Sequence, residues 1–170
     1  MDADSPALIR SITLSVPALD RARRFWVDAL GLTPADITLH RPEHETLWGL
    51  EGAERESLLL WAGDVLVELV SYTTPECRWR PAGYLVSDQG ILNVALGCDD
   101  RRAFDTVFNR ALELGYSANS APWTLPGIAT VVYLNDDQGF SVELLHVEAE
   151  GREYMGFTAN RSSRADRRRE

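Results

Sequence analysis

Lysine is absent from this chain of 170 residues, and all 17 basic residues are arginine. This absence excludes enzymes that form a Schiff base on lysine and nucleotide sites that need the lysine of a phosphate-binding loop. Histidine and cysteine are scarce, with three and two residues. Cys77 and Cys98 have no metal-binding or redox spacing, so we expect reduced thiols rather than a disulfide framework.

Long apolar runs are missing as well. No stretch reaches the roughly 18 apolar residues of a membrane span, and the amino-terminal region lacks the pattern of a secretion signal. These absences predict a cytoplasmic protein with no membrane partner. The formal net charge is −9, although residues 161–170 hold five arginines against two acids. Because the rest of the chain is strongly acidic, we expect no nucleic-acid partner.

A glutamate interrupts two otherwise apolar, strand-like runs, each time within the tripeptide Val-Glu-Leu. Glu68 lies in the run 65–72 and Glu143 in the run 141–147. A charge in the middle of a buried strand is costly unless it is paired, bound to a metal or facing a cavity. The two glutamates therefore predict a functional site within a duplicated module.

The order of expected elements supports duplication. The first half predicts a strand over 8–16, a helix over 17–30 ended by Gly31, and strands over 45–50, 57–62 and 65–72. The second half predicts a strand over 91–98, a helix over 101–114 with Asp99 or Asp100 as its N-cap and Gly115 at its end, and strands over 117–121, 128–135 and 141–147.

Both halves thus follow the order β-α-β-β-β, which indicates an α+β protein of two fused modules. We predict one domain, with module one over about 8–72, a linker over 73–89, module two over about 90–147 and a tail over 148–170. The linker is long enough for the modules to close within one chain or to exchange across a homodimer. The partly apolar stretch 153–157 would pack across the mouth of the barrel or in the interface of such a homodimer.

Three segments resemble the vicinal oxygen chelate superfamily, which includes glyoxalases, bleomycin-resistance proteins and extradiol dioxygenases. They are the opening SITLSVPALD at 11–20, Phe25-Trp26 with the Leu-Gly-Leu at 30–32, and NDDQGFSVEL at 135–144. The resemblance covers about residues 8–147. It implies that the two modules curl into a half-barrel cleft, where a divalent metal usually binds neighbouring oxygens of the substrate.

In the metal-binding members, ligands come from the first and last strands of each module. The resemblance assigns those positions to Ser11, Glu68, Asn93 and Glu143, so both glutamates match and neither first strand supplies histidine. Two carboxylates, a hydroxyl and an amide form a weak oxygen site, better suited to Mg²⁺, Mn²⁺ or Ca²⁺ than to Zn²⁺ or iron. We expect no cofactor or, if a metal binds, a weakly held divalent ion at Glu68 and Glu143.

The histidines offer little help to such a site. His146 follows Glu143 by three positions, so strand alternation directs it to the opposite face. His40 and His44 lie in a loop-like stretch, and one of them would have to reach the cleft on a flap.

Two facing carboxylates in a partly dry cleft tend to share a proton, which is what a general acid and base pair requires. We therefore expect a small-molecule enzyme that transfers protons without a metal, as an isomerase, epimerase, lyase or cyclase. Glu68 and Glu143 would be catalytic, while Ser11 and Asn93 would bind the substrate oxygen. The bland alternative is that each glutamate only satisfies arginine or backbone partners inside the barrel.

Tryptophan supports a competing function. Of the five tryptophans, Trp48, Trp61 and Trp123 fall on segments expected near the cleft, where they would form a stacking wall for a planar ligand. The alternative is therefore a metal-free protein that sequesters an aromatic or cationic small molecule, as bleomycin-resistance proteins do. A metal-dependent glyoxalase or dioxygenase is less favoured, because the imidazole ligands are missing.

Overall fold

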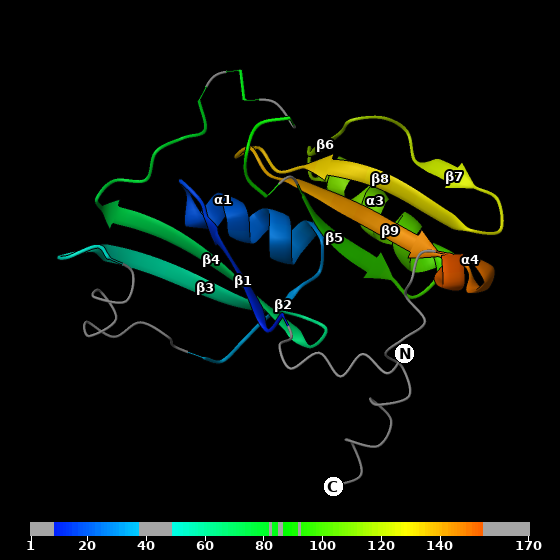
Figure 1. The fold of residues 1–170 in the computed structure, drawn as a ribbon, viewed down its shortest axis with the longest axis horizontal. Coiled ribbons are helices and arrows are strands. Elements are labelled where there is room, and N and C mark those ends of the chain that lie inside the picture. Colours follow the sequence, from blue (N-terminus) through cyan, green and yellow to red (C-terminus); the bar gives the residue numbers. More distant parts are fainter. Residues whose placement is uncertain (1–8, 38–48, 82, 85–86, 92, 155–170) are drawn as a thin grey trace, which may run out of the picture. The chain divides into compact units, whose positions relative to one another are not determined.

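The computed structural model of this protein describes residues 9–37, 49–81, 83–84, 87–91 and 93–154 (Figure 1). The chain divides into two compact units, each with its own sheet. Unit 1 comprises Met1–Gly90 and Asp136–Phe140, and unit 2 comprises Ile91–Asn135 and Ser141–Glu170. Within the described part, no helix is long and apolar enough to cross a membrane.

Unit 1 contains a four-stranded sheet in the order β1-β4-β3-β2. Strand β1 (Ser11–Ser15) runs parallel to β4 (Val65–Thr74). Strand β3 (Glu54–Ala62) is antiparallel both to β4 and to the short β2 (Thr33–Pro34). Between β1 and β2, helix α1 (Leu19–Arg23) continues directly into the π-helix η1 (Arg24–Ala29).

Unit 2 contains a five-stranded sheet in the order β5-β9-β8-β6, with β7 also paired to β8. Strand β5 (Asn93–Cys98) runs parallel to β9 (Ser141–Val147), and β8 (Ala129–Asn135) is antiparallel to β9. The short strands β6 (Ser117–Ala118) and β7 (Trp123–Leu125) are antiparallel to β8. Helix α3 (Arg101–Glu113) follows β5, and α4 (Ala149–Tyr154) follows β9.

The two units share one connectivity, because in each the first strand pairs in parallel with the last. This confirms the predicted α+β fold of two β-α-β-β-β modules. The sequence did not predict β2, β7 or α4. The strand expected over 45–50 falls mostly on residues outside the described part, and residues 49–50 are not a strand.

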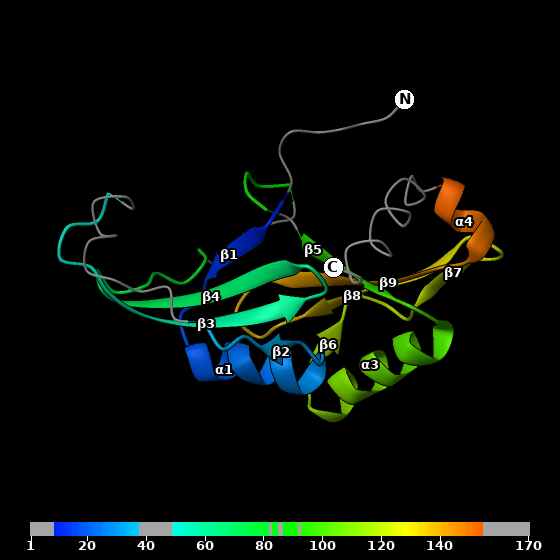
Figure 2. The same ribbon diagram turned by 90° about the horizontal axis from the view of Figure 1, so that it is seen from below.

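In each unit, one helical segment covers one face of the sheet (Figure 2). Alternation along the strands directs every second side chain to that face. In unit 1 the side chains that pack there are almost fully buried: Leu14, Leu60, Val67, Leu69, Ala22, Phe25 and Trp26. In unit 2 the corresponding core consists of Val132, Leu134, Val142, Leu144, Phe104 and Ala111. The opposite face of each sheet carries the alternate residues of the same strands, among them Glu68 and Glu143.

The first helix departs from regular α geometry at its end. The backbone N–H of Leu30 donates to the carbonyl of Phe25 at 2.9 Å, which is the spacing of a π-turn. Consecutive side chains lie about 100° apart on a regular α-helix, so the wider turn helps both Phe25 and Trp26 to reach the core. The two rings are fully buried and pack edge to face, with 5.9 Å between their centroids.

Helix α3 has the ends that its sequence predicts. Asp100, one of the two expected N-caps, accepts a hydrogen bond from the N–H of Ala103 at 2.7 Å. Gly115, with φ of +89°, ends the helix, and the N–H of Tyr116 returns to the carbonyl of Ala111 at 3.0 Å. The cap and the terminal glycine fix the length of the helix that covers the sheet.

The turn between β8 and β9 belongs to unit 1 and contacts α1. The N–H of Ala18, at the start of α1, donates to Oε1 of Gln138 at 2.8 Å, and Arg21 pairs with Asp137 at 2.8 Å. Asp136 is 1% exposed and accepts from the N–H groups of Gln138 and Phe140. Burial raises the pKa of Asp136, whereas these backbone donors lower it.

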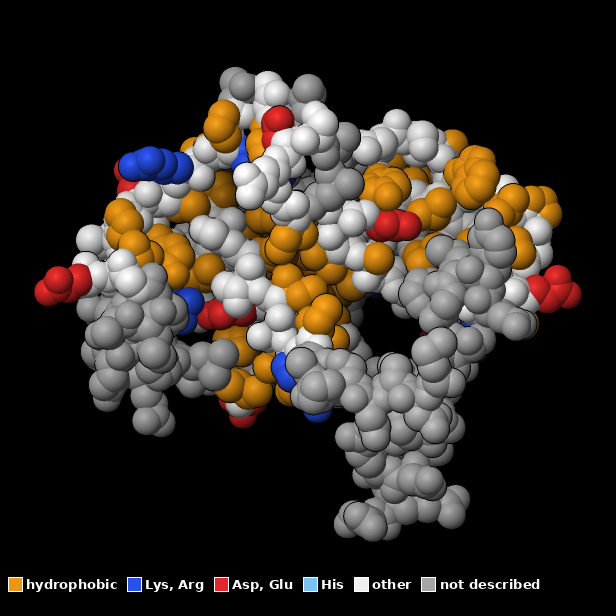
Figure 3. Space-filling view, viewed as in Figure 1, with side chains coloured by type: hydrophobic (Ala, Val, Ile, Leu, Met, Phe, Trp, Pro, Cys, Tyr) orange, Lys and Arg blue, Asp and Glu red, His pale blue; other side chains and the backbone are white. Residues whose placement is uncertain are grey.

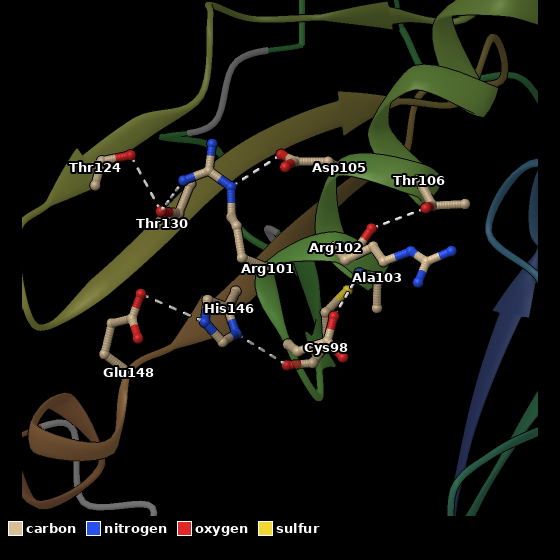
Figure 4. Close-up of polar contacts among 11 residues, drawn as sticks. Cys98, Arg101, Arg102, Ala103, Asp105, Thr106, Thr124, Thr130, His146 and Glu148 are labelled. Atoms are coloured by element: carbon tan, nitrogen blue, oxygen red, sulfur yellow. Dashed lines mark hydrogen bonds and ion pairs between the residues drawn. The ribbon is translucent and has the colours of Figure 1, made fainter.

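A polar cluster lies on the helix-covered face of the second sheet (Figure 4). His146 is buried there, with Nδ1 3.4 Å from the carbonyl oxygen of Cys98 and Nε2 3.5 Å from the carboxylate of Glu148. Thr130, its partner across the strands, accepts a hydrogen bond from Arg101 at 3.1 Å. His146 therefore faces away from Glu143, as strand alternation predicted.

Cys98 is held in its thiol form. Burial, followed by the negative charges of Asp99 and Asp100, raises the pKa of Cys98 from 9.0 to about 11. Only the thiolate is nucleophilic, so this cysteine is not an activated nucleophile at neutral pH. Cys77 and Cys98 are both free thiols, in agreement with the sequence analysis.

We expect iodoacetamide to alkylate Cys98 of the native protein at pH 8 about a hundredfold more slowly than an ordinary thiol, because a two-unit rise in pKa removes that share of thiolate. Peptide mass spectrometry would follow the labelling, with Cys77 as the internal comparison. In urea both cysteines should react at similar rates. Equally fast labelling of Cys98 in the native protein would contradict the assignment.

Candidate functional site

The uncovered face of each sheet carries one of the two glutamates. Residues directly paired across neighbouring strands share a face. Glu68, on β4, is paired with Thr13 on β1 and Leu59 on β3. Glu143, on β9, is paired with Ala95 on β5 and Tyr133 on β8. Each glutamate therefore lies on a strand flanked by a parallel first strand and an antiparallel neighbour.

Glu68 is fully engaged by its neighbours in unit 1. Nη1 of Arg55 lies 3.0 Å from Oε1, and the hydroxyl of Thr13 donates to Oε2 at 2.9 Å. The side chains of Arg55 and Glu68 are only 5% and 11% exposed. Both carboxylate oxygens are thus used in a buried, charge-neutralised cluster.

Glu143 has a different environment in unit 2. The amide of Asn93 donates to Oε2 at 2.8 Å, and the hydroxyl of Tyr133 donates to the same oxygen at 3.2 Å. Among the described residues, no cation pairs with Glu143, and Oε1 receives no hydrogen bond. Two neutral donors therefore orient the carboxylate and leave one oxygen available.

The hydroxyl of Tyr133 is well suited to remain a donor. Burial raises its pKa, and so do the charge of Glu143 and the hydrogen bond to it, while the contact with Asn93 lowers it. The phenol consequently stays protonated at neutral pH, so it can donate to Glu143.

The predicted site residues are distributed over both units. Asn93 and Glu143 are in contact, whereas Glu68 receives its hydroxyl bond from Thr13, and Ser11 is paired with Leu66 instead. Among the tryptophans, Trp61 is 41% exposed on β3 and Trp123 is 59% exposed on β7. Trp48 lies outside the described residues.

Three contact residues were not anticipated from the sequence. Tyr133 could have been found by counting back from the β8–β9 turn, because residues 135 and 141 pair and so do 133 and 143. To predict the contact of Thr13 with Glu68, one would need the register between the parallel strands β1 and β4, and no turn connects these strands to fix it. Arg55 is not paired with Glu68 but with Tyr72, four residues further along β4, and its long side chain reaches Glu68 along the sheet.

The side chains that the structure describes around Glu68 and Glu143 do not form a suitable ligand set for a divalent metal. They include no group of three or more His, Cys, Asp and Glu side chains that could hold an ion. Glu68 would have to release Arg55 and Thr13 before it could bind one. Glu143 contributes one charged group beside a neutral amide and a phenol, which is a poor ligand set for any common metal. His40 and His44 lie outside the described residues.

Comparison with known proteins connects this geometry to a fold. No protein-family model matches the sequence, and no curated protein sequence is significantly similar to it. Solved structures do match. A glyoxalase family protein from Bacillus cereus superimposes with a TM-score of 0.72 and 18% identity, over 86% of this chain and 99% of that one.

Two further structures match at lower scores. A lactoylglutathione lyase from Agrobacterium tumefaciens has a TM-score of 0.53 and 20% identity, over 84% of this chain and 96% of that one. A fosfomycin resistance protein from Mesorhizobium loti has a TM-score of 0.52 and 18% identity, over 81% and 89%. Together with the paired β-α-β-β-β modules, these likenesses show that the chain shares the fold of these three structures, which confirms the fold expected from the resemblance.

Proposed function

We propose that this protein is an enzyme that transfers a proton on a small molecule without a metal, with Glu143 as the general base. One observation carries the proposal. The two donors to Glu143 are neutral and both serve Oε2, so that a charged, oriented carboxylate presents Oε1. A general base needs such a free oxygen within hydrogen-bond reach of the substrate.

The chemistry would take place next to a carbonyl group. Oε1 of Glu143 would remove a proton from the adjacent carbon, and the electrons of the broken C–H bond would move to the carbonyl oxygen as an enolate. The side-chain amide of Asn93 donates one N–H to Oε2 of Glu143, and its second N–H could stabilise the enolate oxygen of the substrate. Return of the proton to a different carbon would give an isomerase, return to the same carbon from its opposite face would give an epimerase, and loss of a leaving group would give a lyase.

Glu68 has a different role in this proposal. The sequence suggested two glutamates that share a proton, but the two oxygens of Glu68 are occupied by Arg55 and Thr13. A carboxylate in a buried ion pair would have to lose that pair before it could accept a proton. We therefore assign Glu68 to the stability of unit 1 and the chemistry to Glu143.

The fold is compatible with this reaction class but does not select it, because one fold supports many activities. One structural neighbour is named a lyase. The second candidate function, sequestration of an aromatic or cationic molecule, is favoured by the exposed indole rings of Trp61 and Trp123. In that case Glu143 would supply charge rather than accept a proton.

Glu143→Gln should lower turnover at least about a hundredfold, because glutamine cannot accept the proton. Wash-out of C–H hydrogens next to the carbonyl of neutral hydroxyketones in D₂O, followed by NMR, measures proton abstraction without knowledge of the product. Glu113→Gln, on the exposed surface of α3, is the matched control and should leave the rate unchanged.

A fully active Glu143→Gln variant would refute the assignment of the base. A wild-type protein that binds these compounds but exchanges no hydrogen would favour the binding function instead, since a sequestering protein has no turnover to lose.

Replacement of Glu143 should also change the titration of Tyr133. The raised pKa of Tyr133 is expected to fall towards its ordinary value in Glu143→Gln, and to stay above it, because the charge disappears while the burial remains. NMR of ¹³C-labelled tyrosine would follow each phenol, with Tyr72 and Tyr116 as internal controls. An unchanged Tyr133 titration would show that the two side chains do not interact in solution.

Removal of one partner of the Arg55–Glu68 pair should destabilise the protein. Glu68→Gln is expected to cost about 3–5 kcal/mol, because the change breaks a buried ion pair. The double variant Arg55→Met, Glu68→Gln should be more stable than the sum of the single changes predicts. Urea unfolding of all four proteins measures this coupling, and additive losses would contradict a direct ion pair.

A further inference from the structure

The uncovered face of the second sheet changes character along its length. Residues that share this face with Glu143 are paired across β8 and β9, beginning with Asn135 and Ser141 next to the turn. The level of Tyr133 and Glu143 follows, and then the level of Val131 and Leu145. The face is therefore polar on one side of Glu143 and apolar on the other.

The polar side is a chain of uncharged groups. The hydroxyl of Ser141 donates to Oδ1 of Asn135 at 2.9 Å, and the amide of Asn135 donates to Oδ1 of Asn119 at 2.7 Å. These bonds leave the second N–H of Asn135, the amide N–H groups of Asn119 and the lone pairs of Ser141 available. Together they offer donors and acceptors suited to hydroxyl and carbonyl groups.

The apolar side is a row across three strands. Trp123 on β7 is paired with Val131 on β8, which is paired with Leu145 on β9. Trp123 is 59% exposed, and hydrophobic side chains gather over β7 and β8 in Figure 3. Leu145 is only 5% exposed, so the accessible part of the row is Trp123 with the half-buried Val131. Next to Leu145, Gly97 on β5 has no atom within 4 Å of the position that a Cβ would occupy. An indole in this position suits a planar ring.

Charge limits what can bind between these two sides. At the positions of β5 to β9 that share this face, all of them described, Glu143 is the only charged residue. Because no arginine stands at any of these strand positions, a phosphate or carboxylate bound between them would lie next to a like charge. Two residues along a strand span about 7 Å, so one small molecule can reach both sides of Glu143.

We propose that the substrate is a neutral molecule with a planar apolar ring at one end and hydroxyl or carbonyl groups at the other. The ring would lie against Trp123, and the oxygens would bind Asn119, Asn135 and Ser141. The carbon between them would lie at Oε1 of Glu143. This inference rests on the proposed function, because it places the reacting carbon at the proposed base.

Two probes with the same ring test the proposal: neutral 2-naphthyl β-glucoside and anionic 2-naphthyl phosphate. Fluorine NMR of protein labelled with 5-fluorotryptophan would report on each indole. The signal of Trp123 is assigned by its loss in Trp123→Phe. Trp79, which is 55% exposed in unit 1, is the control position. We expect the glucoside to shift the Trp123 signal and to bind at least about tenfold more tightly than the phosphate.

Two variants sharpen the result. Asn135→Leu should weaken the glucoside at least about fivefold, because the sugar hydroxyls lose their amide partner. Glu143→Gln should keep glucoside binding and reduce the discrimination against the phosphate. Equal affinity for the two probes, a shift at Trp79 rather than Trp123, or no binding of the glucoside at millimolar concentration would overturn the proposal.

The outcomes separate this proposal from the function on which it rests. If Glu143→Gln abolishes hydrogen exchange while both probes bind equally, the base assignment stands and the substrate class is wrong. If the glucoside binds selectively at Trp123 while Glu143→Gln still exchanges hydrogen at the wild-type rate, the substrate class stands and Glu143 is not the base.

Discussion

Parallel pairing between the first and last strands of each module is the constraint on which the rest of the structure depends. It places β4 between β1 and β3, and β9 between β5 and β8, so that a side chain in the middle of either strand has neighbours on both sides. A carboxylate at such a position cannot remain unsatisfied, because the desolvation of a charge is costly. Its role is therefore decided by the residues that the flanking strands bring to it.

The two modules satisfy this constraint in different ways. In unit 1 Arg55 neutralises the charge of Glu68, and Thr13 donates to its second oxygen. Both carboxylate oxygens therefore already have a partner within the protein. In unit 2 an amide and a phenol share one oxygen of Glu143. The two modules thus carry a glutamate at equivalent strand positions, and their different neighbours are the basis on which we propose a stabilising role for Glu68 and a catalytic one for Glu143.

The fold alone says little about the reaction. Structures with the same architecture carry names as different as a lyase and a fosfomycin resistance protein, and their identity to this chain is 20% and 18%. Our proposal for the chemistry rests instead on the face around Glu143, with its neutral hydrogen-bonding side chains and the exposed Trp123. A scaffold of this kind positions side chains accurately, whereas the side chains themselves decide what is bound and what is transferred.

The sequence by itself determined the elements whose signals are local. Apolar periodicity, the cap at Asp100, the terminal glycines and the repeated Val-Glu-Leu were enough to predict two β-α-β-β-β modules and to select both glutamates. The opposite orientation of His146 followed from strand alternation alone. Only the tertiary structure decided which partners the glutamates have. Strand register brought Thr13 rather than Ser11 to Glu68, and Arg55 reached the same carboxylate from a position not paired with it. Such contacts join residues far apart in the chain and depend on side-chain reach, so no local pattern encodes them.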